Sequence, residues 1–171
     1  MMFRSRKSFY IIGFLLTIAG FALDRITKLW ALSIQGKEDV IVIDGVLQFH
    51  YLENTGAAFS LLNGKFTFFF IVTPILCILI LFLLSKIPYD NKRYLPIWII
   101  GFLILAGAAG NFYDRLVYRY VIDFIYFSLI HFPVFNVADI YVTCGVIVFA
   151  LLYMFYYKEN ELETFYRKKK A

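Results

Sequence analysis

The sequence has few of the side chains that support metal or thiol chemistry. Its 171 residues include only two cysteines and two histidines. Cys77 and Cys144 lie in apolar runs and form neither a disulfide framework nor a zinc-ligand spacing, so we expect both to be packing residues. His50 and His131 each stand alone, which argues against a zinc site. We therefore expect no bound metal and no cofactor.

Motifs of other enzyme classes are also missing. The chain has no GxSxG, no HExxH and no phosphate-binding glycine loop. Ser60 and Ser128 have no base beside them in the sequence. By elimination, carboxylates are the best candidates for catalytic groups.

Charged residues are scarce as well. They make up 17% of the chain, against about a quarter in soluble domains. Hydrophobic residues make up 61%, aromatic residues 20%, and the mean hydropathy is +0.73. This composition indicates a single integral membrane domain over residues 1–171. The net charge of +5 comes from short basic runs beside apolar spans, a placement typical of membrane orientation and not of nucleic-acid binding.

Four stretches are long and apolar enough to cross a bilayer, which requires about 20 residues. They cover about residues 8–32, 66–85, 94–113 and 134–157. The first follows MMFRSRK and could be a cleaved signal peptide, but its cleavage signal is poor and three more spans follow, so we expect an uncleaved helix. The sequence thus predicts a membrane α-helical fold with four transmembrane helices.

Basic residues are concentrated on one side of these spans. Four spans place both chain ends on the same side, and the positive-inside rule makes that side cytoplasmic. The bases there are Arg4, Arg6, Lys7, Lys86, Lys92, Arg93, Lys158, Arg167, Lys168, Lys169 and Lys170. Loops of about 34–65 and 114–133 then face outward. The first contains VIVIDGVLQFHYLEN, with strand-like residues around the turn dipeptide Asp44-Gly45, which predicts a small extracytoplasmic β-sheet lying on the outer surface.

Two isolated carboxylates stand out near the outward ends of the spans. Between Tyr120 and Tyr157 the only charged side chains are Asp123 and Asp139. A carboxylate inside the membrane costs about 2.5–3.5 kcal/mol, and the only basic residue within four positions of either one is Arg119.

Two interpretations of this pair remain open from spacing alone. In the first, the aspartates are separate interfacial residues, one capping a helix and one solvated. In the second, they form a dyad that shares one proton. The charged member would act as general base on a water molecule, while the protonated member donates toward the carbonyl under attack.

The neighbouring polar residues have simpler expected roles. Asn136 and Asp139 are three residues apart, so a helix would place them on one face. Asp114 is adjacent to Arg115 and close to Arg119, and we expect it to form ion pairs at a helix end.

Five short motifs occur in order along the chain. They are DRITK (24–28), ENTGAAFS (53–60), GNFYDR (110–115), VIDFI (121–125) and FNVADI (135–140). With these motifs and the four-span plan, nearly the whole chain resembles the bacterial lipoprotein signal peptidases, or signal peptidase II. It departs from the usual pattern at Ala106 and Ala108, where glycine is frequent, and at Ile140, where serine is frequent. These departures bear on helix packing and substrate fit.

The resemblance implies an aspartic endopeptidase of the bacterial cytoplasmic membrane. Such an enzyme removes the signal peptide from diacylglyceryl-modified prolipoproteins by cleaving before the lipidated cysteine. The resemblance assigns catalysis to Asp123 and Asp139. The positions it implies as supporting or lining the site are Asp24, Lys28, Asn54, Gly56, Asn111, Asp114, Arg115 and Asn136. It also implies that membrane lipids and globomycin-type inhibitors bind the protein, and we expect a monomer.

Two other functions are considered. A small proton-coupled transporter would use the aspartates as proton relays, but it would favour acids near mid-bilayer and paired internal repeats, and the sequence has neither. In a non-catalytic membrane scaffold, carboxylate substitutions would have little effect.

Overall fold

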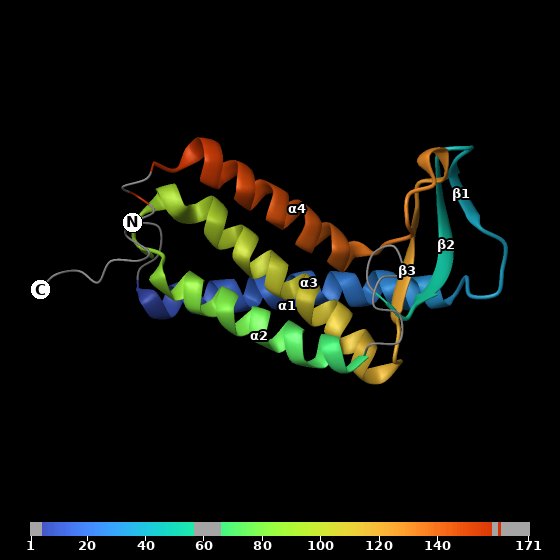
Figure 1. Ribbon diagram of the computed structural model, residues 1–171, viewed down its shortest axis with the longest axis horizontal. Coiled ribbons are helices and arrows are strands. Elements are labelled where there is room, and N and C mark those ends of the chain that lie inside the picture. The colour runs from blue at the N-terminus through green and yellow to red at the C-terminus, as the bar shows by residue number, and fades with distance from the viewer. Residues whose placement is uncertain (1–4, 57–65, 159–160, 162–171) are drawn as a thin grey trace, which may run out of the picture.

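In the part of the chain that the structure describes, four long helices run side by side, and a small sheet lies beyond one end of them (Figure 1). The computed structural model describes residues 5–56, 66–158 and 161. Arg4, Ser60 and the tail bases at 167–170 lie outside the described residues.

The helices match the four-span plan. They are α1 (Arg6–Leu32), α2 (Phe66–Lys86), α3 (Leu95–Val117) and α4 (Val137–Leu151). Short 3-10 helices, η2 (Lys92–Tyr94) and η3 (Ser128–Ile130), lie before α3 and α4, and a π-helical segment, η4 (Leu152–Tyr156), continues α4. All four, with α4 counted together with η4, are long and apolar enough to span a membrane. The predicted membrane α-helical class is confirmed.

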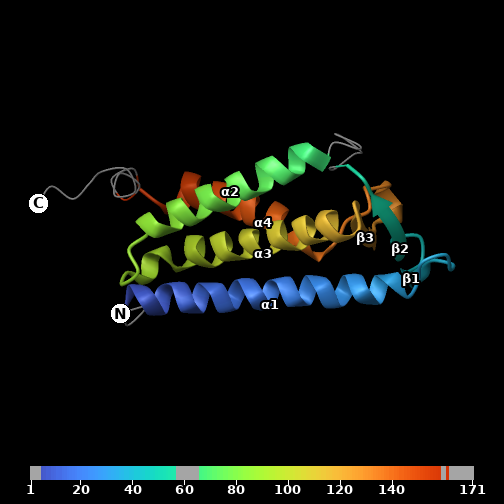
Figure 2. The same ribbon diagram turned by 90° about the horizontal axis from the view of Figure 1, so that it is seen from below.

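Helix α3 is the centre of the bundle. It packs against α1, α2 and α4, and Figure 2 shows it between α1 on one side and α2 and α4 on the other. The contact with α4 depends on a missing side chain, because a Cβ atom at Gly107 would lie 2.5 Å from the backbone oxygen of Ala138. Small residues at such contacts let membrane helices approach closely.

Apolar side chains cover much of the outer helix surface. Ile71 and Ile78 on α2 and Phe155 on η4 are more than half exposed. A buried cluster around Phe9, Trp98 and other residues lies toward the end of the bundle where α1 begins. Helices with so little of their apolar surface buried need lipid around them, which identifies a multi-pass membrane protein.

The small sheet has three antiparallel strands in the order β1 (Val40–Ile43), β2 (Leu47–Asn54) and β3 (Val121–Tyr126). The turn between β1 and β2 contains Gly45 at φ +66°, a conformation that glycine adopts without strain. The sheet predicted around Asp44-Gly45 is therefore present.

The third strand differs from the sequence-based expectation. The segment that contains Asp123 was expected to be a loop, but it forms β3 and pairs with β2, where Asp123 lies opposite Leu52. A six-residue apolar run is weak evidence for a strand by itself. Its partner lies about 70 residues earlier in the chain, so the pairing is decided by the tertiary fold.

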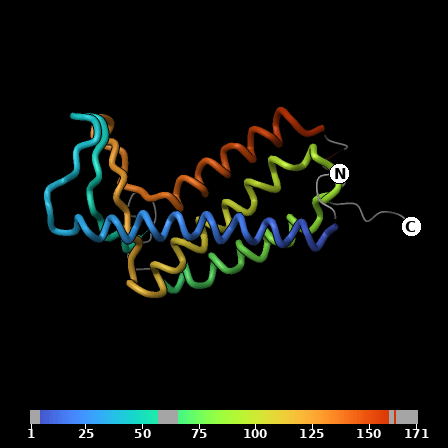
Figure 3. The backbone as a smooth tube through the Cα atoms, turned by 180° about the vertical axis from the view of Figure 1, so that it is seen from behind, coloured from blue at the N-terminus to red at the C-terminus, as the bar shows by residue number. Residues whose placement is uncertain are grey.

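Two helix boundaries also differ from the prediction. Helix α3 continues one turn past residue 113, so Asp114 and Arg115 are helical. Helix α4 begins at Val137 instead of 134, because Phe135 is bonded to the backbone of Ile125 in β3. The chain thus runs back along the sheet before it enters α4, which Figure 3 shows from behind.

Enlarging Gly107 should weaken the α3–α4 contact. We expect Gly107→Ala to destabilise the protein by about 1–3 kcal/mol, since its methyl group would overlap backbone atoms. Thermal unfolding in detergent measures the effect. Ala150→Val, at an exposed position of α4, is the control and should unfold at the wild-type temperature. An unchanged midpoint for Gly107→Ala would contradict the close approach.

Candidate active site

Strand β3 places Asp123 on the face of the sheet opposite to the one that packs against the end of α1. Its neighbours Ile122 and Phe124 pack into a second apolar cluster with Ala31. Because side chains alternate along a strand, Asp123 points to the opposite face. It is only 1% exposed there.

Helix α4 places Asp139 through its N-terminal cap. The Asn136 side chain accepts a hydrogen bond from the backbone N–H of Asp139 at 3.0 Å, and Asp139 Oδ2 accepts one from the backbone N–H of Asn136 at 3.2 Å. This is a capping box. Asn136 is thus the N-cap, not a residue on the helix face as predicted, and the reciprocal bonds bring the two side chains together.

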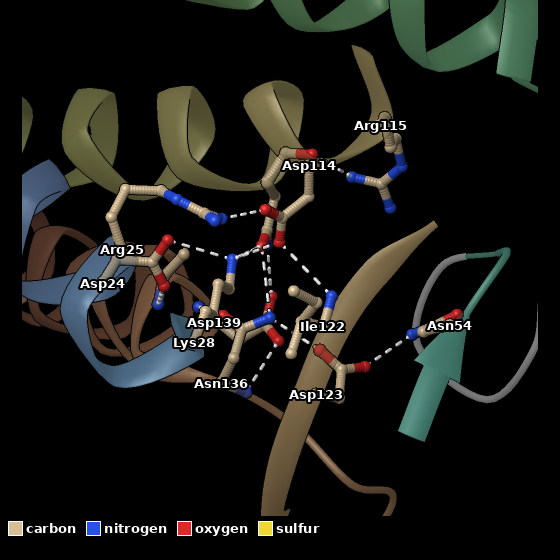
Figure 4. A network of polar contacts seen from close by, with 12 residues as sticks. Asp24, Arg25, Lys28, Asn54, Asp114, Arg115, Ile122, Asp123, Asn136 and Asp139 are labelled. Atoms are coloured by element: carbon tan, nitrogen blue, oxygen red, sulfur yellow. Dashed lines mark hydrogen bonds and ion pairs between the residues drawn. The ribbon is translucent and has the colours of Figure 1, made fainter. Parts of the chain in front are cut away.

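The Asn136 amide also reaches the other aspartate. Its Nδ2 donates to Asp123 Oδ1 at 2.6 Å, so one side chain contacts both carboxyl-bearing residues (Figure 4). Asp123 and Asp139 line the same cavity of about 310 Å³. The interpretation of two independent interfacial residues fits only in part. Asp139 does cap a helix, but Asp123 is buried and not solvated.

The cavity has a polar side and an apolar side. Asn54 Nδ2 donates to Asp123 Oδ2 at 2.9 Å, and Asn111 Nδ2 donates to Asp139 Oδ1 at 2.7 Å. Arg115, on α3, also lines the polar side of the cavity. The remaining lining residues are Val121, Phe132, Pro133, Val134, Phe135, Ile140, Thr143 and Cys144.

Burial raises the pKa of Asp123 to about 7, and the negative charge of Asp139 adds to the rise. Hydrogen bonds from Asn54 and Asn136 and the charge of Lys28 act in the opposite direction. The electrostatic effect of Asp139 on Asp123 means that the two carboxyl groups titrate as a pair.

A buried ionic cluster supports the polar side. Lys28 has no exposed surface, and its Nζ lies 2.9 Å from both Asp24 Oδ2 and Asp114 Oδ2 and donates to Asn111 Oδ1 at 2.8 Å. Arg25 donates to the other oxygen of Asp114. The cluster therefore fastens α1 to α3 next to the aspartates.

Further contacts join this cluster to α4 and the sheet. Asp24 Oδ1 accepts the backbone N–H of Ala138 at 3.0 Å, and Asp114 Oδ2 accepts that of Ile122 at 3.3 Å. Each carboxylate thus links its helix to one segment that carries an aspartate of the cavity, since Ala138 precedes Asp139 and Ile122 precedes Asp123.

The expected partners of Asp114 were wrong. Asp114 pairs with Arg25 and Lys28 of α1, not with Arg115 or Arg119. The guanidinium of Arg119 lies over the ring of Phe70, 5.6 Å from its centre. Local spacing suggested that the ion-pair partners of Asp114 are its sequence neighbours. In α3, however, the side chain of Asp114 points toward α1.

Arg115 has a different environment. Its Nη2 donates to the backbone oxygen of Gly56 at 2.8 Å, and its guanidinium lies 4.0 Å from the ring centre of Phe69. The Gly56 N–H donates to Asn54 Oδ1 at 2.9 Å. Arg115 forms no salt bridge within residues 5–56, 66–158 and 161.

Together with the contacts described above, all ten site residues named from the sequence lie in one connected polar network or at its edge.

Some contributors were not anticipated. Arg25 was not singled out, although its position within DRITK was visible, because nothing in the sequence pairs it with Asp114. Cys144 was expected to be a packing residue, but it is exposed and lines the cavity. Cys77 packs against the buried aromatic cluster, as expected.

Within the described part of the chain, no group of three or more His, Cys, Asp or Glu residues could hold a metal ion.

Comparison with known proteins adds sequence and structural relatives. A family model described as "Signal peptidase (SPase) II" matches residues 16–155. A "Lipoprotein signal peptidase" of Clostridium tetani is 42% identical over 153 residues, covering 87% of this chain and 94% of that protein. The protein of the same name from Clostridium novyi is 40% identical, covering 80% and 93%. A solved structure titled "Bacterial membrane enzyme structure by the in meso method at 2.3 A resolution" superposes with a TM-score of 0.72 at 30% identity, covering 94% and 93%.

Removing one member of the ionic cluster should destabilise the protein strongly. We expect Asp114→Asn to cost about 3–5 kcal/mol, because Lys28 and Arg25 would each lose a buried carboxylate. Asp44→Asn is the matched control in the exposed β1–β2 turn, where asparagine also suits the turn. Thermal unfolding of both variants in detergent measures the difference, and equal midpoints would count against the role of the cluster.

Proposed function

The chain belongs to the signal peptidase II family, and we propose that it is an aspartic endopeptidase acting on diacylglyceryl-modified prolipoproteins. It removes the signal peptide by hydrolysing the bond before the lipidated cysteine. One observation carries the catalytic assignment: Asp123 and Asp139, from different elements, line one cavity and are joined through Asn136.

The mechanism uses the two aspartates in opposite protonation states. Two carboxylates in a poorly solvated site do not both ionise easily, so they share one proton. The ionised member takes a proton from a water molecule, and the water oxygen attacks the scissile carbonyl. The protonated member donates to the carbonyl oxygen, where negative charge develops.

The charges around the cavity fit a singly protonated pair. In the cluster beneath it, the positive charges of Arg25 and Lys28 balance the negative charges of Asp24 and Asp114. Arg115 then supplies one further positive charge beside the cavity. This charge balances one ionised aspartate and not two.

The apolar side of the cavity suits a lipidated substrate. Ile140, Thr143 and Cys144 line it from an exposed face of α4. In a membrane this face meets lipid, so acyl chains bound to the substrate cysteine can remain in the bilayer while the peptide enters the cavity. Globomycin-type inhibitors would occupy the same cavity.

We also propose the membrane orientation from the distribution of bases. The start of α1 and the end of α4 lie at the end of the bundle away from the sheet (Figure 1). With these ends in the cytoplasm, the sheet and the aspartates lie near the extracytoplasmic surface of the bacterial inner membrane. The single-domain and monomeric state remain predictions.

Substitution of either aspartate should abolish cleavage. We expect Asp123→Asn and Asp139→Asn each to lower kcat on a synthetic diacylglyceryl lipopeptide on the order of 10²–10⁴-fold, the usual effect of losing a general acid or base. Because the two act as one unit, the double variant should be no slower than the singles. Asp90→Asn, at the other end of the molecule, should cleave normally. Cleavage at wild-type rate by either site variant would overturn the assignment.

Activity should fall on the alkaline side of neutrality. The raised pKa of Asp123, about 7, means that the pair keeps its one shared proton below that pH and loses it above. Two ionised carboxylates leave no group to donate to the carbonyl. A pH profile of kcat/KM should therefore decline as pH rises through about 7, and a flat profile from pH 6 to 9 would contradict a shared proton.

A further inference from the structure

Three asparagine side chains donate from their NH₂ groups to the aspartates. The orientation of each amide is fixed by a donor that bonds to its oxygen. The amide oxygen of Asn54 accepts the N–H of Gly56, and that of Asn136 accepts the N–H of Asp139. The amide oxygen of Asn111 accepts from Lys28. Since each oxygen already faces a donor, the nitrogen must face the carboxylates.

The orientation of the amide group is most strongly constrained at Asn111. A lysine ammonium has donors and no acceptor, and Lys28 donates to the Asn111 amide oxygen while it forms ion pairs with Asp24 and Asp114. A reversed Asn111 amide would place its NH₂ against the ammonium and its oxygen against Asp139. Both contacts would be repulsive, so Lys28, together with the Asn136 amide that donates to the same oxygen at 3.2 Å, sets which end of Asn111 reaches Asp139.

All four carboxyl oxygens of the pair accept a hydrogen bond. Asp123 receives one on each oxygen, from Asn54 and Asn136. Asp139 also receives one on each, from the Asn111 side chain and the Asn136 backbone. The number of donors therefore does not distinguish the two aspartates, and the difference must come from burial and charge.

Burial opposes a negative charge on either aspartate, but exposure and nearby charges make it less unfavourable on Asp139 than on Asp123. Asp123 is 1% exposed on a strand, whereas Asp139 is only partly buried and lies in the first turn of α4, where the helix dipole stabilises an anion. The charge of Lys28 acts on both aspartates, whereas the guanidinium of Arg115, from α3, acts more strongly on Asp139 than on Asp123. From β3 the facing group is Asp123 itself.

We propose that Lys28 is a positioning residue which, through Asn111, keeps Asp139 ionised, so that Asp139 is the general base and Asp123 holds the shared proton. This inference rests on the proposed peptidase function and assigns the two roles that the function requires. The proton preference of Asp123, whose pKa is raised to about 7, agrees with it.

The assignment gives a balanced reaction. Asp139 takes a proton from water as the water oxygen bonds to the carbonyl carbon, and Asp123 gives its proton to the carbonyl oxygen. The product of this step is a neutral gem-diol, with Asp139 protonated and Asp123 ionised. When the C–N bond breaks, the Asp139 proton passes to the leaving amine and one hydroxyl proton returns to Asp123. The pair ends in its starting state.

A direct test follows the two carboxyl carbons. Full-length protein labelled with ¹³C-aspartate is titrated in detergent by NMR, and the signals are assigned by their loss in Asp123→Asn and Asp139→Asn. We expect the Asp123 signal to titrate near pH 7 and the Asp139 signal to show an ionised group through that range. A protonated Asp139 beside an ionised Asp123 at pH 6 would overturn the assignment.

The role of Lys28 and Asn111 is tested by variants. Asn111→Leu and Asn111→Ala each remove both ends of the amide without adding a charge. In both, the proton should pass to Asp139, and the Asp123 signal should then titrate about one pH unit lower, within the range of a neighbouring charge. Lys28→Met also removes a positive charge that lowers the pKa of Asp123, so in this variant, once its fold is checked by circular dichroism, the Asp123 signal should titrate higher than in Asn111→Leu.

The matched control is Asn91→Ser, which alters an asparagine at the other end of the molecule, where its side chain caps η2. It should leave both titrations unchanged. A folded Asn111→Leu or Asn111→Ala protein with wild-type titrations would overturn the role of Asn111, because a purely structural contact would not decide where the proton lies.

Lipopeptide cleavage on the same samples separates two kinds of failure. If the wild type cleaves but Asp139 carries the proton, only the assignment of roles is wrong. If the wild type does not cleave although Asp123 carries the proton, the proposed function is wrong and the charge arrangement stands.

Discussion

The structure of the site depends on a fully buried lysine that lies between two carboxylates and an amide oxygen. Nζ of Lys28 forms ion pairs with Asp24 and Asp114 and donates a hydrogen bond to Asn111 Oδ1. An ammonium group without such partners would be very unfavourable in a membrane protein. Its partners are therefore constrained in turn: Asp24 lies one turn earlier on α1, and Asp114 and Asn111 lie on one face of α3. Through these contacts a charge on the first helix determines the geometry at the start of the fourth.

Packing of small residues makes this arrangement possible. At Gly107 helix α3 has no side chain toward α4, and at Gly110 a Cβ atom would meet the Asp24 carboxylate. The backbones of α3 and α4 can then approach until Asp24 reaches the N–H of Ala138. The polar network is thus enclosed by close backbone contacts, while the outer faces of the helices remain apolar for lipid. The same enclosure limits the solvation of Asp123 and favours a shared proton.

Particular residues show where local patterns mislead. The sequence indicated that Asp114 would pair with Arg115, because they are adjacent, yet the adjacent residues of a helix point in different directions. Asp114 faces α1, whereas Arg115 faces the backbone of Gly56. The strand at Val121–Tyr126 was not predicted, since its six residues become a strand by pairing with β2. That pairing turns Asp123 from an expected loop residue into one with a fixed direction.

The sequence by itself determined the four membrane helices, the sheet around Asp44-Gly45 and the short set of polar residues from which a site could be built. These features follow from local quantities: the length of apolar runs, turn chemistry and the high free energy of isolated charges in lipid. Only the tertiary structure decided that Asp123 and Asp139 line one cavity, that Asn136 contacts both, and that Lys28 reaches Asp139 through Asn111. The hydrogen bond between Lys28 and Asn111 joins residues 83 positions apart, and that from Asn136 to Asp123 joins two elements with different backbone geometry. Such contacts depend on how whole helices and strands pack, which no local pattern specifies.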